Sequence, residues 1–448
     1  MKRVSFYTLG CKLNYSETSS ISRLFEQNGY KKVDFEEGAD IYIINTCSVT
    51  EHADKKCRKI VREAQRIAGN PYIIIIGCYA QLKPAEIAEI PGVDLVLGAS
   101  EKFRIMEYLD GLEKKCKPGI FASPISEART FHDAYSLNDR TRTFLKIQDG
   151  CDYSCSFCTI PLARGGSRSN SIDQVVASAR EIAASGIREI VLTGVNTGDF
   201  GSRDGFRESR FIDLVRELDE IDGNVRFRIS SIEPNLLSDE LIEVIAGSGK
   251  FVPHFHIPLQ SGSNKILKMM RRRYQRELYA ERVNNIKSAL PRACIGADVI
   301  VGFPGESESD FLDTHAFITD LEISYLHVFP YSERSNTQAM TLDGSVPGKV
   351  RQYRSEVLRN LSSKKRRKFY EDNLGMTAEV LFESDIEDGM IAGFTENYIR
   401  AEAKYDPVLL NEIRKVRLIG INNKGLAEIR EAGEVGEINS SLPELHQL

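Results

Sequence analysis

The chain has 448 residues, of which 42% are apolar, and its formal net charge is −5. This length and composition predict two or three domains with hydrophobic cores, whereas so small a net charge says little about partners. The longest continuous apolar stretch, residues 72–76, is the length of a strand, so we expect no transmembrane helix. The first residues lead directly into a patterned strand without the apolar region of a signal peptide, which predicts a cytoplasmic protein with no membrane contact.

Residues 1–135 form the first predicted domain, in which strands alternate with helices. Apolar strand patterns lie at 4–9, 41–45, 72–76 and 95–97, and helical patterns follow at 16–28, 51–67, 84–90 and 103–112. Continuous apolar strands that alternate with helices indicate a parallel sheet covered on both faces. We therefore predict an α/β fold with a doubly wound parallel sheet.

The cysteines of this chain predict metal or catalytic chemistry. Nine cysteines in a large chain without a secretory signal favour a reducing compartment over disulfides. Three of them, Cys11, Cys47 and Cys78, stand directly after predicted strands, and the carboxyl ends of such strands meet at one crevice. Gly10 and Gly77 would let the backbone approach a ligand closely. Three buried structural cysteines are the alternative, but three in register favour a 4Fe–4S cluster. Three other cysteines show no such pattern and are interpreted as structural: Cys57, Cys116 and Cys294.

Residues 136–332 form the second predicted domain, with six strand–helix repeats. Strands are expected at 144–147, 189–193, 226–230, 254–258, 296–301 and 325–329, and helices at 172–185, 212–220, 238–246, 275–290 and 308–321. The segment is too short for an eight-stranded barrel. An open barrel of six β/α units fits its length.

The first loop of this domain holds three cysteines within eight residues, Cys151, Cys155 and Cys158. A structural zinc site needs four ligands, and the nearest histidines in the sequence, His132 and His254, are not adjacent to the loop. Three thiolates suit three irons of a 4Fe–4S cube and leave the fourth iron open for a reacting ligand. A zinc knuckle with a distant fourth ligand is the alternative.

This cysteine spacing, with the aromatic Phe157 before the third cysteine, resembles that of the radical S-adenosylmethionine (SAM) enzymes. The resemblance implies the open (β/α)6 barrel. It also implies that SAM chelates the open iron through its amino and carboxylate groups and is cleaved by an electron from the cluster to a 5′-deoxyadenosyl radical.

The same resemblance assigns residues at the strand ends to SAM. From the residues alone, these segments are typical of ordinary strand-to-helix turns and N-caps. Gly194 and Asn196 resemble the segment that holds the methionyl amino end of SAM. The other neighbours of SAM that the resemblance implies are Phe157, Ser231, Gln260 and Val301. These residues are expected to bind the cofactor, and the sequence assigns no catalytic residue.

Two stretches are strongly basic, and each is either a solvated helix or a contact for nucleic-acid phosphates. Residues 265–273 contain no acid, and their basic residues are Lys265, Lys268, Arg271, Arg272 and Arg273. Residues 349–368, inside the predicted linker 333–372, carry nine lysines or arginines against Glu356 alone. This second stretch ends in Lys364, Lys365, Arg366, Arg367 and Lys368.

Residues 373–437 are expected to form a small β-barrel, followed by a tail at 438–448. Strand patterns lie at 377–382, 390–394, 398–401, 413–419 and 426–429, which resembles the RNA-binding TRAM module. From residue 373 to the end, seven basic residues face fourteen acidic ones. Because affinity for nucleic acid depends on positive charge, we expect RNA contact only at the basic linker or at a local patch: Tyr398, Arg400 and Lys424.

The order of these modules resembles the methylthiotransferases over essentially the whole chain. That family adds a methylthio group to an unactivated carbon. The resemblance implies two 4Fe–4S clusters, one for hydrogen removal and one for sulfur supply. It also implies that SAM serves both as the radical source and as the methyl donor.

The residues around the strand-end cysteines indicate the substrate. The run 8–14, which reads Thr-Leu-Gly-Cys-Lys-Leu-Asn, with Tyr15 and Glu17 after it, resembles the branch that acts on N(6)-threonylcarbamoyladenosine at position 37 of tRNA. Residues 45–50 and 54–56 agree with this branch. The expected partners are tRNA, an electron donor and a sulfur source. The alternatives are a methylthiotransferase for isopentenyladenosine in tRNA or for a ribosomal protein, and a non-catalytic iron–sulfur RNA-binding protein.

Overall fold

The computed structural model describes residues 1–47, 51–109, 114–137, 140–203 and 205–431. The chain folds as two compact units, Met1–Arg366 and Arg367–Leu448. The predicted boundary between residues 135 and 136 lies inside the first unit and stays a prediction. In the described segments, no helix is long and apolar enough to cross a bilayer.

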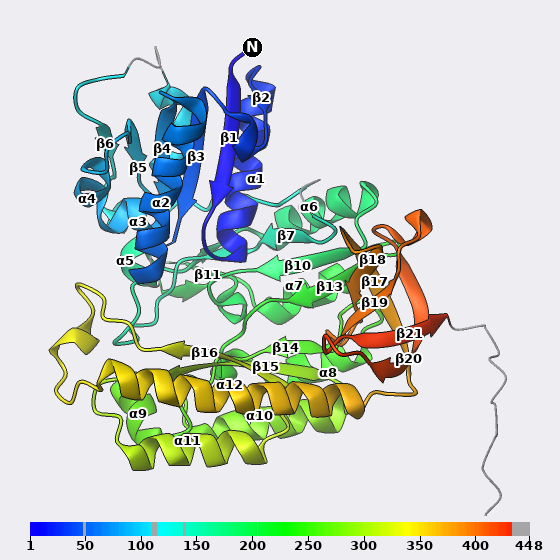
Figure 1. The fold of residues 1–448 in the computed structure, drawn as a ribbon. Helices are drawn as coiled ribbons and strands as arrows, with labels where there is room; N and C mark the ends of the chain where they lie inside the picture. The colour runs from blue at the N-terminus through cyan, green and yellow to red at the C-terminus, as the bar shows by residue number, and fades with distance from the viewer. Residues whose placement is uncertain (48–50, 110–113, 138–139, 204, 432–448) are drawn as a thin grey trace, which may run out of the picture. The chain divides into compact units, whose positions relative to one another are not determined.

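The N-terminal part of the first unit is a parallel sheet with the strand order β2-β1-β3-β4-β5-β6 (Figure 1). Helix α1 (Lys12–Gln27) and the 3-10 helix η2 (Glu101–Tyr108) cover one face of the sheet. Helices α2 (Glu51–Ala68), α3 (Cys78–Leu82) and α4 (Pro84–Ala88) cover the other face. Each face has its own apolar core, which confirms the doubly wound sheet. The strands are β1 (Arg3–Thr8), β2 (Lys31–Lys32), β3 (Ile41–Thr46), β4 (Tyr72–Gly77), β5 (Leu95–Leu97) and β6 (Gly119–Phe121).

Two helices of this part differ from their predictions by more than two residues or in helix type. Helix α1 begins at Lys12 instead of residue 16, because Cys11 already has the extended backbone of an N-cap residue. The predicted helix 103–112 is the 3-10 helix η2, and residues 110–113 lie outside the described chain. The edge strands β2 and β6 are too short to show a period in the sequence.

The central part of the first unit has six parallel strands in two ladders, β13-β10-β7 and β14-β15-β16. A parallel bridge between Phe227 and Phe251 continues the pairing from β13 towards β14. The strands are β7 (Thr143–Lys146), β10 (Glu189–Thr193), β13 (Arg226–Ile229), β14 (His254–His256), β15 (Cys294–Val301) and β16 (Tyr325–Pro330). Their helices are α6 (Ile172–Ala184), α7 (Phe211–Asp219), α8 (Asp239–Gly247), α10 (Arg276–Ala289) and α11 (Glu308–Asp320). The main apolar core lies between these strands and helices. These observations confirm the open (β/α)6 barrel.

Short elements that show no period in the sequence frame the cysteine loop. Strand β8 (Gln148–Asp149) pairs antiparallel with β9 (Arg168–Ser169), and the loop and helix α5 (Ile160–Arg164) lie between them. Helix α9 (Asn264–Met269) follows β14. A small antiparallel pair, β11 (Ser202–Arg203) with β12 (Phe206–Arg207), follows β10.

The basic linker is helical, as predicted. Helix α12 spans Gly348–Glu371, and its residues up to Arg366 belong to the first unit. There Leu358 is fully buried in the core of the barrel, and Arg354 pairs with the buried Glu306 at 2.6 Å. One face of α12 is therefore packed against the barrel.

The second unit contains a closed barrel with the strand order β17-β18-β19-β21-β20, which confirms the predicted small β-barrel. Tyr398, which we expected to begin the third strand, has φ 68° and precedes it. The strands are β17 (Thr377–Glu387), β18 (Met390–Phe394), β19 (Arg400–Lys404), β20 (Ile413–Ile421) and β21 (Ala427–Glu431).

Candidate active site

The central cysteine loop is arranged to hold sulfur ligands. The backbone N–H of Tyr153 donates to Cys151 Sγ, and that of Ile160 donates to Cys158 Sγ, both at 3.4 Å. The third sulfur, Cys155 Sγ, accepts from a guanidinium N–H at 3.2 Å. Burial raises the pKa of Cys151 and of Cys158 to about 12. Buried thiols of this kind ionise when a metal binds them, and N–H donors to sulfur are typical of iron–sulfur ligation. The loop therefore fits a cluster.

The guanidinium at Cys155 belongs to Arg272, which corrects one sequence prediction. Two residues after helix α9, Arg271 has φ 57°, and Arg272 N–H donates back to the Leu267 carbonyl at 2.9 Å. This helix-ending turn directs the Arg272 side chain inward, where it is 4% exposed and pairs with Glu233. Arg272 is therefore a partner of the cluster loop and is not available as a surface contact for RNA.

The other basic residues of this stretch have different surroundings. Lys268 and Arg271 are exposed. Lys265 pairs with Asp310 at 2.7 Å. Arg273 stacks over the Tyr153 ring at 3.9 Å and donates to the Asp152 carbonyl, so it also supports the cysteine loop.

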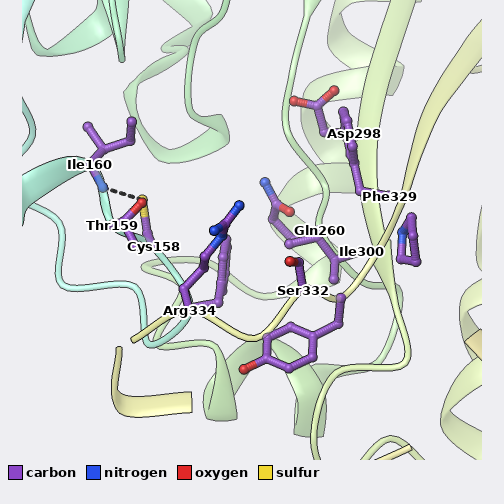
Figure 2. Close-up of a pocket in the computed structure, with 12 residues that line it drawn as sticks. Cys158, Thr159, Ile160, Gln260, Asp298, Ile300, Phe329, Ser332 and Arg334 are labelled. Carbon is purple, nitrogen blue, oxygen red and sulfur yellow. Dashed lines mark hydrogen bonds between the residues drawn. The ribbon is translucent and has the colours of Figure 1, made fainter. Parts of the chain in front are cut away.

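A cavity of about 230 Å³ opens beside the cysteine loop (Figure 2). Two predicted SAM neighbours, Phe157 and Gln260, line it together with Cys158. On strand β15, Ile300 lines the cavity, whereas Val301 is fully buried in the outer core, because successive side chains of a strand face opposite sides. The Val301 side chain therefore does not line this cavity, and the role of Val301 as a neighbour of SAM stays a prediction. Lining residues that the sequence did not reveal are Thr159, Ile160, Asp298, Phe329, Pro330, Tyr331, Ser332 and Arg334.

The remaining predicted SAM residues lie at the neighbouring strand ends. Asn196 N–H donates to Gln148 Oε1 at 3.0 Å, and Thr197 N–H donates to the Ser231 carbonyl at 3.1 Å. A Cβ atom at Gly194 would approach Gln148 Oε1 to 2.9 Å, so glycine is required for this close packing. Two of the predicted SAM residues have a buried side-chain atom without a hydrogen-bond partner among the described residues, Asn196 Nδ2 and Gln260 Oε1. Because buried polar groups normally find a partner, these atoms fit a polar ligand such as SAM.

The three N-terminal cysteines follow β1, β3 and β4, which are neighbours in the sheet. Asn14 Nδ2 ties the first two loops together by donating to the Leu9 carbonyl at 2.9 Å and the Thr46 carbonyl at 3.0 Å. Thr46 Oγ1 donates to the Ile76 carbonyl at 2.6 Å and so connects the second loop to the end of β4, which precedes Cys78. Gly10 has φ 117°, and a Cβ there would meet Cys47 Cβ at 2.7 Å.

The geometry of these loops therefore brings Cys11, Cys47 and Cys78 to one edge of the sheet. Burial raises the pKa of the Cys78 thiol, and the nearby thiol of Cys11 also raises it. Such a set of sulfur donors fits a second cluster.

A buried network of charges, which the sequence did not reveal, connects the two cysteine sites. Helix α5 begins two residues after Cys158 and ends in Arg164. Arg164 donates to Glu17 Oε1 at 3.0 Å, to Asp149 Oδ1 at 2.9 Å and to Asn14 Oδ1 at 2.7 Å. Three further cations join the two carboxylates: Lys102, Lys146 and Arg168.

This network leaves positive charge beside the N-terminal cysteines. Its four cations exceed its two carboxylates by two charges. The thiols of Cys11 and Cys78 are electrostatic neighbours of Arg164. A nearby cation favours thiolate over thiol, so the network is suited to stabilise an anionic cluster.

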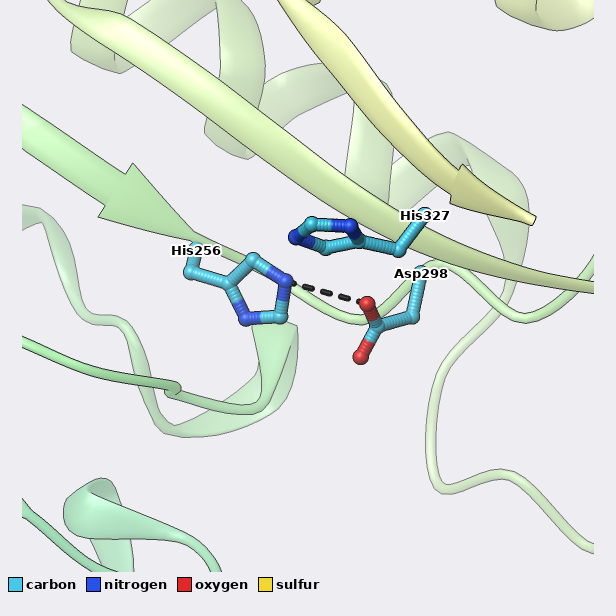
Figure 3. Close-up of side chains that lie close together, drawn as sticks. All are labelled: His256, Asp298 and His327. Carbon is cyan, nitrogen blue, oxygen red and sulfur yellow. Dashed lines mark hydrogen bonds and ion pairs between the residues drawn. The ribbon is translucent and has the colours of Figure 1, made fainter. Parts of the chain in front are cut away.

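A polar group also lies inside the barrel. His256, Asp298 and His327 come from three adjacent strands, and their ligand atoms lie within 4.8 Å of one another (Figure 3). His256 Nε2 and Asp298 Oδ1 form a hydrogen bond of 3.0 Å. Asp298 also lines the cavity, so this group adjoins it. The two histidines considered as zinc ligands have other partners, since His132 stacks on Phe103 and His254 bonds to Tyr325.

Some basic residues at the end of α12 already have partners within the protein. Lys365 Nζ donates to the Thr319 and Leu321 carbonyls at 3.0 and 2.8 Å, so it caps helix α11 instead of facing RNA. Lys364 and Arg366 are exposed and pair with no described acid. In the second unit, Arg367 and Lys368 pair with acids one turn ahead, Glu371 and Asp372.

The second unit also has an aromatic and basic surface near β18. Tyr398 stacks on Phe394 with ring centroids 4.7 Å apart. Arg400 is exposed and lies over the same Phe394 ring at 5.9 Å. Lys424, by contrast, pairs with Glu402 at 3.3 Å. Stacked aromatics beside a cation are typical of surfaces that bind single-stranded nucleic acid, and Phe394 is a member that the sequence did not reveal.

Comparisons with known proteins show which family models and proteins this chain resembles. The model of the radical SAM superfamily matches residues 145–318, and that of uncharacterized protein family UPF0004 matches residues 3–98. The chain is 43% identical over 426 residues to threonylcarbamoyladenosine tRNA methylthiotransferase MtaB of Bacillus subtilis (strain 168), covering 94% of both chains. It is 41% identical to the MtaB protein of Aquifex aeolicus (strain VF5), covering 89% of this chain and 95% of that one.

Other proteins resemble this chain at lower sequence identity. The tRNA-2-methylthio-N(6)-dimethylallyladenosine synthase of Akkermansia muciniphila is 30% identical, covering 93% of this chain and 96% of its own. Among solved structures, the radical SAM methyltransferase TsrM from Kitasatospora setae, with cobalamin and a [4Fe-4S] cluster bound, has a TM-score of 0.55 at 14% identity, covering 87% of this chain and 80% of that one. At so low an identity, the likeness concerns the fold alone.

Proposed function

The chain belongs to the radical SAM tRNA methylthiotransferase family, and from this premise we propose that it converts N(6)-threonylcarbamoyladenosine at position 37 of tRNA to its 2-methylthio derivative. As a member of the family it is a transferase that uses SAM and 4Fe–4S clusters. We place the reaction in the cytoplasm, where its tRNA substrate is found.

We assign the two clusters to the two cysteine triads. The supporting observation is that each triad is drawn together by its own loop geometry and that Arg164 contacts both neighbourhoods. When bound, the central cluster with SAM supplies the radical that removes hydrogen, and the N-terminal cluster supplies sulfur. The residues around them position these groups: Arg272 holds the Cys155 sulfur, and Asn196 and Gln260 offer polar atoms to SAM.

The substrate branch is supported by the first strand end and by the relatives. Residues 8–14 carry the branch-like run around Cys11, and two relatives above 40% identity are named as acting on threonylcarbamoyladenosine. A relative named for dimethylallyladenosine is 30% identical. Part of the second motif, residues 48–50, lies outside the described chain.

The substrate is tested by mass spectrometry of nucleosides at position 37 of tRNA from cells with and without this gene. We expect the 2-methylthio derivative of threonylcarbamoyladenosine to disappear in the deletion strain and to return on complementation. Loss of the 2-methylthio derivative of isopentenyladenosine instead, or an unmodified ribosomal protein, would assign the chain to another branch of the family.

The roles of the two triads are tested by one pair of variants. Replacing Cys11, Cys47 and Cys78 by alanine should leave 5′-deoxyadenosine formation intact and stop thiolation, because radical formation needs only the open iron of the central cluster. Product from this triple variant would refute the sulfur-supply role of the N-terminal triad. The matched variant replaces the central triad by alanine and should lose both activities.

We propose that RNA contacts the exposed basic end of α12 and the aromatic surface of the second unit. The residues that remain candidates are Lys268, Arg271, Lys364, Arg366, Arg367, Tyr398 and Arg400. Each phosphate contact that is removed lowers the slope of log affinity against log salt by about one. Replacing Lys364 and Arg366 by alanine should weaken tRNA binding and lower this slope by about two, without changing SAM cleavage. The control is Lys365→Ala, which should leave the slope unchanged because its ammonium already binds two carbonyls.

A further inference from the structure

Two histidines and an aspartate share the inner face of three adjacent barrel strands. In the ladder β14-β15-β16, Asp298 is the direct register partner of His327, and His256 pairs with Gly296, two residues before Asp298. Because residues two apart on a strand share a face, the three side chains leave the sheet on the same side. The residues that flank them in the sequence are buried in the outer apolar core: Phe255, Ile257, Ala297, Val299, Leu326 and Val328. His256, Asp298 and His327 therefore point into the barrel.

The distances between these three side chains suit a single metal ion. Their ligand atoms lie within 4.8 Å of one another, and Figure 3 shows the side chains turned towards one another. His256 Nε2 lies 3.0 Å from Asp298 Oδ1, and the rings of His256 and His327 have centroids 5.5 Å apart. Two ligand atoms on one tetrahedral zinc ion are about 3.4 Å apart. Modest rotations of the side chains would thus bring all three ligand atoms onto one ion.

The strands also supply an outer layer that holds one of the histidines. A Cβ atom at Gly296 would collide with the ring of Tyr325, so the glycine makes room for that ring on the inner face. The Tyr325 ring packs edge-on against His327 with centroids 5.2 Å apart. Its hydroxyl forms a hydrogen bond of 3.0 Å with His254 Nε2. Such contacts fix the orientation of histidines that bind metals.

The three side chains adjoin the cavity beside the cysteine loop. Asp298 lines this cavity together with Gln260 and Cys158. The Gln260 N–H donates to the Asp298 carbonyl at 2.8 Å, and the Gln260 carbonyl accepts from the Ile300 N–H at 2.9 Å. An ion bound by Asp298 would therefore lie at the cavity wall. Three protein ligands leave a coordination position open, as in metal sites that bind a reacting molecule.

The chemistry of the ligands selects the kind of ion. Two imidazole nitrogens and one carboxylate oxygen suit Zn²⁺, Fe²⁺ and similar transition metals, whereas Mg²⁺ and Ca²⁺ take oxygen ligands. The charges near His327 include the cations Lys12 and Arg366 as well as Asp298. Surplus negative charge therefore does not attract a cation to this site. Binding must depend on bonds to imidazole, which favours a transition metal.

We propose that His256, Asp298 and His327 bind a divalent transition metal ion, with an open coordination position towards the cavity. The open position accepts an oxygen or nitrogen donor from a molecule in the cavity. This site is separate from both cysteine triads. The inference goes beyond the proposed function and does not depend on it, because metal binding is measured without RNA.

The test uses zinc as the probe. Anaerobically purified holoenzyme is incubated with zinc chloride and desalted, and its zinc and iron are measured by mass spectrometry. X-ray absorption at the zinc edge then identifies the neighbouring atoms. We expect about one zinc per chain in addition to the iron, with nitrogen or oxygen at about 2.0–2.1 Å and without the sulfur at about 2.3 Å that cysteine ligands give. Excess magnesium chloride should not displace this zinc.

Two variants locate the ion. His256→Asn and His327→Asn each remove one ligand and should weaken zinc binding at least about tenfold while the iron content stays unchanged. The control is His315→Asn, on helix α11 and not among its buried residues, which should keep its zinc.

Three results would overturn the proposal. They are a wild-type protein that retains no zinc, zinc surrounded by sulfur, which would place it at a cysteine triad, and equal retention of zinc by wild type, His256→Asn and His327→Asn. If the histidine variants lose iron or fail to fold, the atoms around zinc in the wild-type protein decide alone.

Discussion

Replacing Glu17 by glutamine should destabilise the first unit more than any comparable change on its surface. The Glu17 side chain is fully buried and accepts from Lys102 at 2.6 Å, Lys146 at 3.2 Å and Arg164 at 3.0 Å. Burial alone raises its pKa, but the charges of Arg164, Lys102 and Lys146 hold the pKa well below its usual range. At neutral pH the residue is therefore ionised, and glutamine removes one of the two anions that balance four buried cations.

The expected loss follows from the burial of these groups. Removing one partner of a buried ion pair costs about 3–5 kcal/mol. An unfolding entropy of about 2.1 cal/mol/K per residue gives roughly 0.8 kcal/mol/K for the unit Met1–Arg366. The melting temperature of this unit should thus fall by about 4–6 °C. Because the chain has no tryptophan, the measurement is far-UV circular dichroism on anaerobically purified protein.

Two further variants test whether the loss of stability depends on the burial of Glu17 or follows from removing any paired carboxylate. Glu86 also has several partners, Arg58 at 2.8 Å and Lys83 at 3.0 Å, but its side chain is 38% exposed. Glu86→Gln should cost less than about 1 kcal/mol, or roughly 1 °C. Adding Lys102→Met to Glu17→Gln removes a cation left without its partner and should restore part of the stability. Equal melting temperatures for Glu17→Gln and Glu86→Gln would refute this reasoning.

Three other outcomes are expected. The protein purified anaerobically should contain about eight irons, and about four when Cys151, Cys155 and Cys158 are replaced by alanine; zinc at either triad would contradict the two-cluster assignment. Gly10→Ala should lower iron by up to half while SAM cleavage continues, because its Cβ would collide with the Cys47 side chain, whereas Gly29→Ala has the same left-handed backbone but open space and should keep its iron. Burial, helped by the charges of Lys146 and Lys102, lowers the pKa of His132 to about 4. The stability that neutral His132 contributes above pH 6.5 is therefore lost as the pH falls from 6.5 to 4, and the loss is smaller than the full shift implies because the ring is only partly buried. His132→Leu should flatten the melting temperature in that window, and an unchanged pH profile would exclude this residue as the cause.

Local spacing made the cysteine sites predictable. Cys151, Cys155 and Cys158 are close in the sequence, and a short loop keeps them close in space. The three strand-end cysteines could be placed because parallel strands align their carboxyl ends whatever lies between them. Local spacing did not show which side of β15 the Val301 side chain faces, since one residue of register decides it. It also did not show that Arg272 is buried, since the left-handed Arg271 after α9 turns that side chain inward.

By itself, the sequence determined the three architectures, the six cysteines and the chemistry they imply, because strand and helix periods and ligand spacing are local properties. Only the tertiary structure decided which charges are buried and with whom. Glu17 and Arg164 are 147 residues apart in the chain and 3.0 Å apart in the fold, and Arg272 and Cys155 are 117 residues apart in the chain and 3.2 Å apart in the fold. Isolated charged residues carry no period, so their burial depends on how distant segments pack, and that packing sets the surroundings of the clusters.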